Sequence, residues 1–322
     1  MTVFELFESL REGVKLPMSY TFDLEKRIHI LYLFSSFLLA FYVYKNSKQK
    51  LSFLAYVFNK KIWLSPSAYV DYFLFFFNGL IKVLLILPYL SFALLLASSF
   101  QDSLYLAFGP QYQFIEPTVL VLMYWFASVL LQDFGTYLVH LAFHKLPWLW
   151  EFHKIHHSAE SLNPISQYRI HPIELIVNNL KSSLILGFNL GLFNYLANGS
   201  MSELEFLSVN IFSFLFLFWG ANLRHSHVAL KYFHKLEHWL ISPFQHQIHH
   251  SNNTKHFDKN LGAKLAIWDR LFGTLIRSKD IRSKLKFGLQ EQEQIHYRSF
   301  FQNLMMPFVQ LLRRFGALFK KL

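Results

Sequence analysis

Long apolar runs without charged residues alternate with polar segments along most of the chain. A helix that crosses a bilayer needs about 20 predominantly apolar residues, and several of the runs approach that length. A soluble core would rarely need so many. The pattern predicts an all-α, multi-pass membrane bundle of about four or five transmembrane helices. The runs are Ile28–Tyr44, Val83–Gln101, Pro117–Gln132, Ser182–Ser202 and Phe206–Leu223.

The second run leaves two local structures open. A Phe-rich stretch, Ala68–Ile81, joins it through Lys82. Residues 69–100 therefore form either one long helix kinked at Pro88 or a hairpin that turns near Asn78-Gly79. At the N-terminus, no short basic-apolar-small-residue cleavage pattern precedes the first run. That run is expected to be a retained anchor or an interfacial helix rather than a signal peptide.

Basic residues alternate with the apolar runs. The chain has 31 Lys and Arg against 20 Asp and Glu, a net charge of +11. Segments 45–63, 145–174 and 223–322 are rich in Lys and Arg, whereas 101–116 and 195–203 contain none. By the positive-inside rule the basic segments, including the C-terminus, are cytoplasmic. The charge is thereby explained without nucleic acid, which we do not expect as a partner. The first 27 residues are nearly balanced in charge and leave the side of the N-terminus open.

The C-terminal stretch Phe308–Leu322 places Arg and Lys among Phe and Leu. It predicts an amphipathic helix on the cytoplasmic leaflet, with an ordinary surface helix as the alternative. We expect three regions: an N-terminal segment 1–66 with one anchor or interfacial helix, a catalytic membrane domain 67–300 with its motif core at 117–275, and an amphipathic C-terminal helix 301–322.

The chain contains no cysteine but sixteen histidines. The absence of cysteine excludes disulfides, Cys-based zinc fingers, iron–sulfur clusters and a thiolate nucleophile. Fourteen of the histidines lie between His140 and His256. The densest groups are His140-x-x-x-His144, His153-x-x-His156-His157 and His246-x-x-His249-His250. The last two share the pattern H-x-x-H-H, and a Ser follows each of them.

These spacings favour a metal site. Residues three or four apart share one helix face, and so many imidazoles packed without a cation would leave buried donors and acceptors unsatisfied. In each H-x-x-H-H triplet the i and i+4 rings share a direction while i+3 diverges, which indicates two metals rather than one. Imidazole ligands suit Fe, Zn, Cu or Ni. A location at the cytoplasmic ends of the spans favours iron that activates O2 on a lipid.

Taken together, the motifs resemble the fatty acid hydroxylase/sterol desaturase superfamily, in particular bacterial sterol desaturase family proteins. They are the three groups above, His171-Pro-Ile-Glu174, His225-Ser-His227, Asp258-Lys-Asn-Leu-Gly262 and Ile267-Trp-Asp-Arg-Leu-Phe-Gly-Thr274. The resemblance implies a histidine-rich cytoplasmic cap with two Fe ions and O2 as co-substrate. Zn could take their place in a purified sample. It also implies hydroxylation or desaturation of a fatty-acyl, sterol or related lipid.

The same resemblance assigns metal-ligand roles to nine histidines: His140, His144, His153, His156, His157, His225, His246, His249 and His250. His171 and His227 join them as candidates, although His171 could instead order its loop and relatives often have other polar residues at the position of His227. Two residues depart from the family pattern. Leu141 stands where Arg is common, and Leu261 replaces a frequent Tyr.

Four carboxylates are candidates for holding the imidazole N–H groups, as carboxylates commonly do around metal-bound histidines. Each could equally be a helix cap or a salt-bridge partner. They are Asp133, Glu174, Asp258 and Asp269. His29, His234, His238 and His296 match no motif and are expected to be ordinary.

We therefore predict a membrane oxidoreductase, with no catalytic residue beyond the metal ligands. No Gly-rich dinucleotide fingerprint occurs, so a separate redox protein is expected to supply electrons. The enzyme alternative is a monooxygenase of alkylglycerol ether lipids. The alternative of another class is a non-catalytic membrane metal-binding protein. We expect an integral protein of the bacterial inner membrane with its histidine clusters on the cytoplasmic side.

Overall fold

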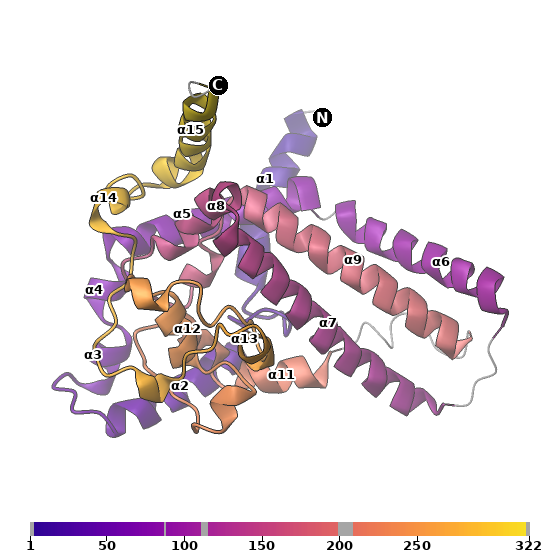
Figure 1. The fold of residues 1–322 in the computed structure, drawn as a ribbon, viewed down its shortest axis with the longest axis horizontal. Helices are drawn as coiled ribbons and strands as arrows, with labels where there is room; N and C mark the ends of the chain where they lie inside the picture. Colours follow the sequence, from indigo (N-terminus) through magenta and orange to yellow (C-terminus); the bar gives the residue numbers. More distant parts are fainter. Residues whose placement is uncertain (1–2, 87, 111–114, 199–208, 320–322) are drawn as a thin grey trace.

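The computed structural model describes residues 3–86, 88–110, 115–198 and 209–319, and this part of the chain is built from helices and loops without a β-sheet (Figure 1). The all-α prediction is confirmed. The longer helices are α1 (Val3–Ser19), α2 (Ile30–Lys45), α5 (Pro66–Ile81), α6 (Pro88–Phe108), α7 (Pro117–Lys145), α8 (Pro147–His157), α9 (Pro172–Ala197) and α15 (Phe300–Phe319). The shorter ones are α3 (Phe53–Val57), α4 (Lys60–Trp63), α11 (Ile211–Phe218), α12 (Pro243–His249), α13 (Ile267–Leu271) and α14 (Glu291–Gln294).

Three helical segments of the described chain are long and apolar enough to span a bilayer: Pro66–Leu84, Pro117–Lys145 and Pro172–Ala197. Helix α2 is apolar but has only 16 residues. The fifth predicted run does not form one helix in its described part, because α11 stops at Phe218 and Gly220 adopts a left-handed φ of 86°. Positions 199–202 and 206–208 of the last two predicted runs lie outside the described residues.

Helix α5 passes straight through Asn78-Gly79, so the kinked helix is correct and the hairpin is not. The helix continues into a π-helical turn, η1 (Lys82–Ile86), just before Pro88 begins α6. Proline lacks an N–H and clashes with the preceding turn, which accounts for a break at this place. Gly79 is needed for packing: a Cβ there would lie 2.5 Å from the Gly13 carbonyl oxygen of α1.

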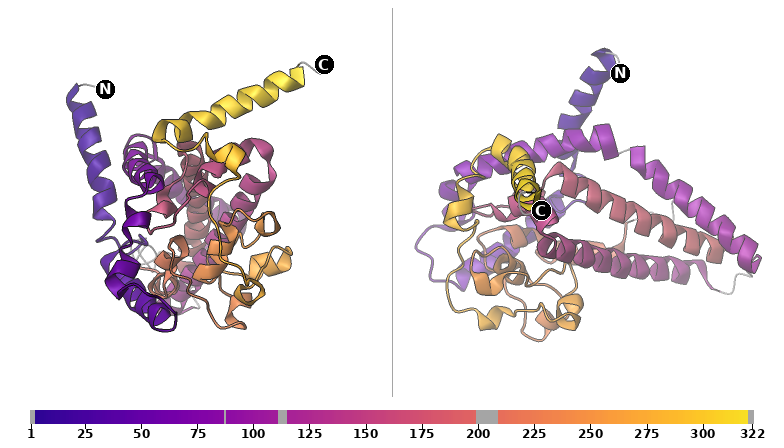
Figure 2. Two further views of the ribbon diagram at one scale, coloured as in Figure 1. Left: turned by 90° about the vertical axis from the view of Figure 1, so that its left-hand side faces the viewer. Right: turned by 45° about the horizontal axis from the view of Figure 1, so that its top comes forward.

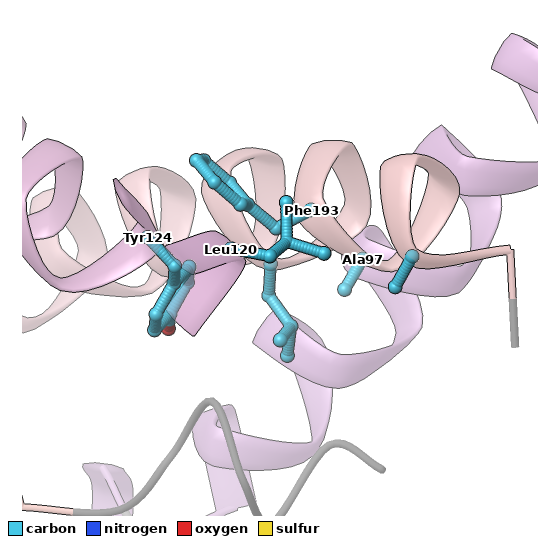
Figure 3. Packing of buried hydrophobic residues seen from close by; sticks show 6 residues of the cluster. Ala97, Leu120, Tyr124 and Phe193 are labelled. Carbon is cyan, nitrogen blue, oxygen red and sulfur yellow. The ribbon is translucent and has the colours of Figure 1, made fainter. Parts of the chain in front are cut away.

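Helices α6, α7 and α9 lie side by side and extend away from the rest of the molecule (Figure 1). Their contact contains Ala97 of α6, Leu120 and Tyr124 of α7, and Phe193 of α9 (Figure 3). Small residues bring α6 and α9 close, since a Cβ on Gly191 would lie 2.5 Å from the Ala97 carbonyl oxygen. Many outward side chains of these helices are large and apolar, as a lipid-facing surface requires.

The other end of these helices carries a cap of short helices and loops (Figure 1). It includes α8, α12, α13 and a 3₁₀ turn, η3 (Ala221–His225). The three basic segments belong to this end, whereas the C-terminus of α6, the N-terminus of α7 and the C-terminus of α9 meet at the far end, where Tyr195 Oη donates to the Gly109 carbonyl at 3.1 Å. The predicted alternation of charge therefore separates the two ends of the bundle.

The terminal helices α1 and α15 extend from the same side of the molecule and diverge (Figure 2). Helix α15 begins at Phe300, next to the start of the expected region 301–322, and packs on α8 and α5. Arg314 pairs with buried Glu151 at 2.9 Å, while Phe301 and Leu312 stay exposed. The helix is thus amphipathic and has one face attached to the cap.

A buried ion pair fixes the loop between α8 and α9. Arg169, 1% exposed, donates to Asp71 Oδ1 of α5 at 3.1 Å and to the Ile155 carbonyl at 3.1 Å. The other Asp71 oxygen accepts from Ser166 Oγ at 2.6 Å and from Asn163 Nδ2 at 3.1 Å. Every partner is buried, so removing one member leaves an uncompensated charge.

We predict that Asp71→Ala lowers the free energy of unfolding by about 3–5 kcal/mol, because Arg169 then remains buried without a counter-ion. Asp280→Ala removes one side of the exposed Arg277–Asp280 pair and should cost less than about 1 kcal/mol. Unfolding of the detergent-solubilised variants measures both. The double variant Asp71→Ala/Arg169→Met should recover part of the loss. Equal stability of Asp71→Ala and Asp280→Ala would refute a structural role for the buried pair.

Candidate metal centre

The nine histidines assigned as ligands come together in two adjacent groups inside the cap. Within each group, one ring nitrogen per residue lies within 4.8 Å of the others. The five-histidine group contains His140, His144, His153, His157 and His249. The four-histidine group contains His156, His225, His246 and His250.

Each H-x-x-H-H triplet gives two histidines to one group and one histidine to the other. On α8, His153 and His157 belong to the five-histidine group and His156 to the other. At α12, His246 and His250 belong to the four-histidine group and His249 to the first. The i and i+4 rings thus share one group while i+3 points to the neighbouring one, as the 100° advance per residue requires.

Local sequence explains why these short helices form where they do. Helix α8 starts at Pro147, in the first helical position, where a missing N–H costs nothing. Helix α12 starts with a capping box, in which Ser242 Oγ accepts from Gln245 N and Gln245 Oε1 accepts from Ser242 N. The start of each helix is fixed, and so is the direction in which its histidines point.

In the five-histidine group, four rings point Nδ1 outward at an acceptor. His140 Nδ1 faces the Leu261 carbonyl at 2.8 Å, and His249 Nδ1 faces that of Lys259 at 2.9 Å. His153 Nδ1 lies 2.9 Å from Glu174 and His144 Nδ1 lies 3.2 Å from Asp258. Each Nδ1 therefore carries the proton, and the Nε2 lone pair faces inward.

The inward nitrogens lack partners of the kind that a protein supplies. Nε2 of His144, His157 and His249 is buried without a hydrogen-bond partner in the described part of the chain. In the four-histidine group, His225 Nε2 lies 3.1–3.3 Å from the Nε2 atoms of His156, His246 and His250. Converging lone pairs repel one another unless a cation lies between them. The residues therefore fit metal ions, one in each group.

Burial keeps these rings neutral. It lowers the pKa of His153 and of His156 to about 3. Burial and neighbouring rings hold the pKa values of His157, His249 and His250 well below the usual range. At pH 7 the rings are unprotonated, the state in which imidazole binds a metal.

The four candidate carboxylates divide into two kinds. Glu174 and Asp258 contact His153 and His144, as described above. Asp133 instead accepts from the backbone N–H groups of Lys264 and Leu265 at 2.6 and 2.9 Å. Asp269 accepts from the N–H groups of Leu261 and Gly262 at 2.7 and 2.8 Å. These two bind the loop rather than an imidazole, and they hold the Leu261 carbonyl in place for His140.

His171 and His227 lie outside both groups. His171 is the N-cap of α9: its Nδ1 accepts from Ile173 N at 3.1 Å, and its Nε2 lies 3.2 Å from the Leu304 carbonyl of α15. His227 Nε2 lies 2.8 Å from the Tyr56 carbonyl. In this structure they connect α15 and α3, respectively, to the cap.

Two cavities reach the histidines from different directions. The larger, about 380 Å³, lies beside α5 and α7 and is lined by His140, His153 and His225 among others. The smaller, about 240 Å³, is lined by His144, His157 and His249 together with Asp258 and Glu293. The five-histidine group is therefore reached from both cavities.

A family model described as fatty acid hydroxylase matches residues 125–274, just under half of the chain. This range contains every histidine of both groups. The part of the chain that carries the histidine groups is therefore similar to the fatty acid hydroxylase family. No solved structure matches it.

Curated relatives share the same region. Alkylglycerol monooxygenase of Danio rerio is 30% identical over 196 residues, covering 61% of this chain and 39% of the relative. Ornithine lipid hydroxylase OlsE of Rhizobium tropici is 27% identical over 150 residues, 46% of this chain and 40% of the relative. Human cholesterol 25-hydroxylase is 30% identical over 153 residues, which cover 46% of this chain and 49% of the relative. The chain matches less than half the length of these relatives.

Sequence reasoning missed several groups that orient the histidines of both groups. They include the carbonyls of Leu261, Lys259 and Arg169, the last lying 3.2 Å from His156 Nδ1. Arg224, next to His225, lies 3.1 Å from His246 Nδ1. A carbonyl belongs to every residue and leaves no signal in composition, whereas the position of Arg224 beside a ligand could have marked it.

We predict that Glu174→Ala weakens metal binding about 10- to 100-fold, because His153 Nδ1 loses the acceptor that orients the ring. Competition with a chelator of known affinity, using Zn²⁺, measures the change. Glu174→Gln keeps an acceptor oxygen and should retain most of the affinity. If both variants bind Zn²⁺ like the wild type, Glu174 does not orient the ligand.

We also predict that metal-free protein loses stability between pH 6.5 and about pH 3. Unfolded histidines take up protons near pH 6.5, whereas the buried rings resist protonation down to about pH 3. The unfolded state thus binds more protons as the pH falls, at a cost of about 1.4 kcal/mol per such histidine at pH 5.5. Thermal unfolding of chelator-treated protein should give a lower Tm at pH 5.5 than at pH 7.5. The exposed-site variant His234→Ala should show the same decrease. A Tm that is constant across this range would contradict the burial of neutral rings.

Proposed function

We propose that the chain is an integral membrane, non-haem di-iron oxygenase that oxidises a C–H bond of a lipid. The observation that carries the proposal is the pair of histidine groups, whose inward nitrogens converge on two neighbouring points at the end of membrane helices. Relatives named as hydroxylases and monooxygenases support the reaction class. Reduced iron supplies the activation of O2 that C–H oxidation needs.

Overall, one oxygen atom enters the C–H bond and the other leaves as water, with two electrons and two protons consumed. Desaturation uses the same inputs but removes two hydrogens and forms two waters. The electrons come from a separate redox protein. The chain's own contribution is to hold nine neutral imidazoles, to orient them through Glu174, Asp258 and three loop carbonyls, and to surround the reacting carbon with a partly apolar cavity.

Helix α7 explains how one site can meet both a lipid and a soluble electron donor. Its 29 residues extend about 44 Å, whereas the hydrocarbon core of a bilayer is about 30 Å thick. His140 and His144 lie in its last turns, beyond that thickness. We infer that the centre lies at the cytoplasmic face of the membrane. In a bacterium this would be the inner membrane.

Some of the relatives also name one specific form of the reaction. Alkylglycerol monooxygenases from Danio rerio, Xenopus tropicalis and Homo sapiens all match this chain. Hydroxylation of the carbon next to an ether oxygen would use the same iron ligands and differ only in how the lipid is placed. The remaining alternative is a metal-binding protein without catalytic turnover. The following test distinguishes it from an oxygenase.

We predict about two iron ions per chain in protein purified from aerobic cells. Lipid mass spectrometry of cells with and without the gene should reveal a lipid that has gained one oxygen or lost two hydrogens. His156→Ala and His249→Ala, one from each group, should remove at least 90% of this product while the protein still inserts into the membrane.

His234→Ala is the matched control, because this exposed histidine belongs to neither group. It should leave iron content and product unchanged. One iron per chain, or full product formation by His249→Ala, would disprove the di-iron proposal. Bound metal without any lipid change would establish the non-catalytic alternative.

A further inference from the structure

The larger cavity beside the histidines is lined by cationic side chains as well as by histidines. It lies between α5, α7, the start of α9, the α1–α2 loop and the loop at 261–263. Phe75, Val139, Phe143 and Leu261 form apolar parts of its lining. Imidazoles, neutral polar side chains and charged side chains line the rest.

Four basic and two acidic side chains line this cavity: Lys26, Arg27, Lys82, Arg224, Glu25 and Glu174. Lys26 is paired with Asp23 at 3.4 Å and with Glu25 at 4.0 Å. Glu174 contacts His153 and no basic side chain within salt-bridge distance. Arg27, Lys82 and Arg224 therefore have no carboxylate within salt-bridge distance among the residues that the structure describes. The carboxylates that act on them, Asp23, Asp133 and Asp269, do so only from a longer distance.

Two of the three cations, Arg224 and Lys82, donate to neutral groups instead. Arg224 is buried and donates to the carbonyls of Gly262 and Ala263, while its Nε has no partner in the described chain. Lys82 donates to Tyr20 Oη at 3.0 Å. The Arg27 guanidinium makes no hydrogen bond to a described residue, and burial lowers the pKa of Arg27 from its usual range.

Cations without a carboxylate in contact are costly in a partly open cavity, because more distant carboxylates recover only part of the desolvation of each charge. Metal ions would add to this excess, since neutral imidazoles bring no negative charge to compensate them. Such an excess attracts an anion, and phosphate and carboxylate are the groups that Arg and Lys bind best. Glu25 is exposed and contacts Lys26, so it leaves the excess in place.

We propose that this cavity binds the anionic head of the lipid substrate, a phosphate or carboxylate, with Arg27, Lys82 and Arg224 as its counter-ions. The proposal rests on the proposed function and specifies its substrate class. Because the same cavity of about 380 Å³ is lined by His140, His153, His156, His225 and His246, the carbon that reaches the metal centre lies close to the head. Oxidation near the polar end of the lipid follows, rather than oxidation at the middle of a long chain.

Matched lipid pairs test the charge requirement without turnover. Metal-loaded protein in neutral detergent is titrated anaerobically with an alkylglycerol 3-phosphate and with the uncharged alkylglycerol of equal chain length, and likewise with a fatty acid and its fatty alcohol. In at least one pair, the anionic member should bind about tenfold or more tightly. Equal affinity within both pairs overturns the proposal.

Variants test whether the preference for the anionic lipid arises from this cavity. Arg27→Gln and Lys82→Met should each reduce the affinity for the anionic lipid about tenfold and change that for the neutral lipid less than twofold. Lys26→Gln is the matched control, because this lining cation already has acidic partners, and it should change neither affinity more than twofold. Arg27→Lys keeps the charge and should restore most of the preference. Metal content equal to that of the wild type verifies that each variant is folded.

Two further measurements are needed. One distinguishes a lipid head from a soluble anion as the bound group, and the other distinguishes failure of the head-group proposal from failure of the proposed function. If glycerol 3-phosphate without a chain binds as tightly as its alkyl form, the cavity is a site for soluble anions and the lipid-head proposal fails. If lipid oxidation is observed but neither pair shows an anionic preference, the proposed function stands and the head-group proposal falls. If the preference and its loss in Arg27→Gln are observed without any oxidised lipid, the head-group site stands and the proposed function falls.

Discussion

Nine neutral imidazoles turned inward on two neighbouring points are the constraint on which the rest of the structure depends. Their converging lone pairs are unfavourable together unless cations lie between them, so the surrounding protein has to hold every ring against this repulsion. Outward Nδ1 contacts with carbonyls and carboxylates achieve this. Those contacts in turn require fixed loops, and the loops are fixed by buried polar anchors such as Asp133, Asp269 and the Arg169–Asp71 pair.

The membrane helices and the metal centre form one mechanical unit. Helix α7 spans the apolar layer, carries two histidines in its last turns, and binds the loop at 264–265 through Asp133 near its middle. Glu174 lies in the first turn of helix α9 and contacts His153. Under the proposed function, the length of α7 sets the depth of the histidine groups relative to the bilayer.

The parts of this structure that were predictable from sequence are those governed by local periodicity. The spacing of His153, His156 and His157 already determines that i and i+4 share a direction, and apolar runs identify the long helices. The kink before Pro88 could not be distinguished from a hairpin, because both satisfy the same composition. Only the structure shows α1 packed against Gly79.

Interactions between distant segments were beyond the sequence. Asp71 and Arg169 are 98 positions apart, and nothing in either neighbourhood marks the other as its partner. Asp133 and Asp269 were expected to hold imidazole N–H groups, but their oxygens bind backbone N–H groups, which no residue identity encodes. The charge excess of the larger cavity likewise arises from the α1–α2 loop, η1 and η3 together, and becomes visible only once these segments are adjacent.

Three of the acceptors that orient the histidines are main-chain carbonyls, those of Leu261, Lys259 and Arg169. A carbonyl is present whatever side chain its residue bears, so substitution there leaves ring orientation intact as long as the loop keeps its path. Leu261 shows the consequence: its carbonyl faces His140 while the residue itself forms part of the cavity wall. A substitution at such a position can therefore reshape the wall without turning the imidazole that the carbonyl orients.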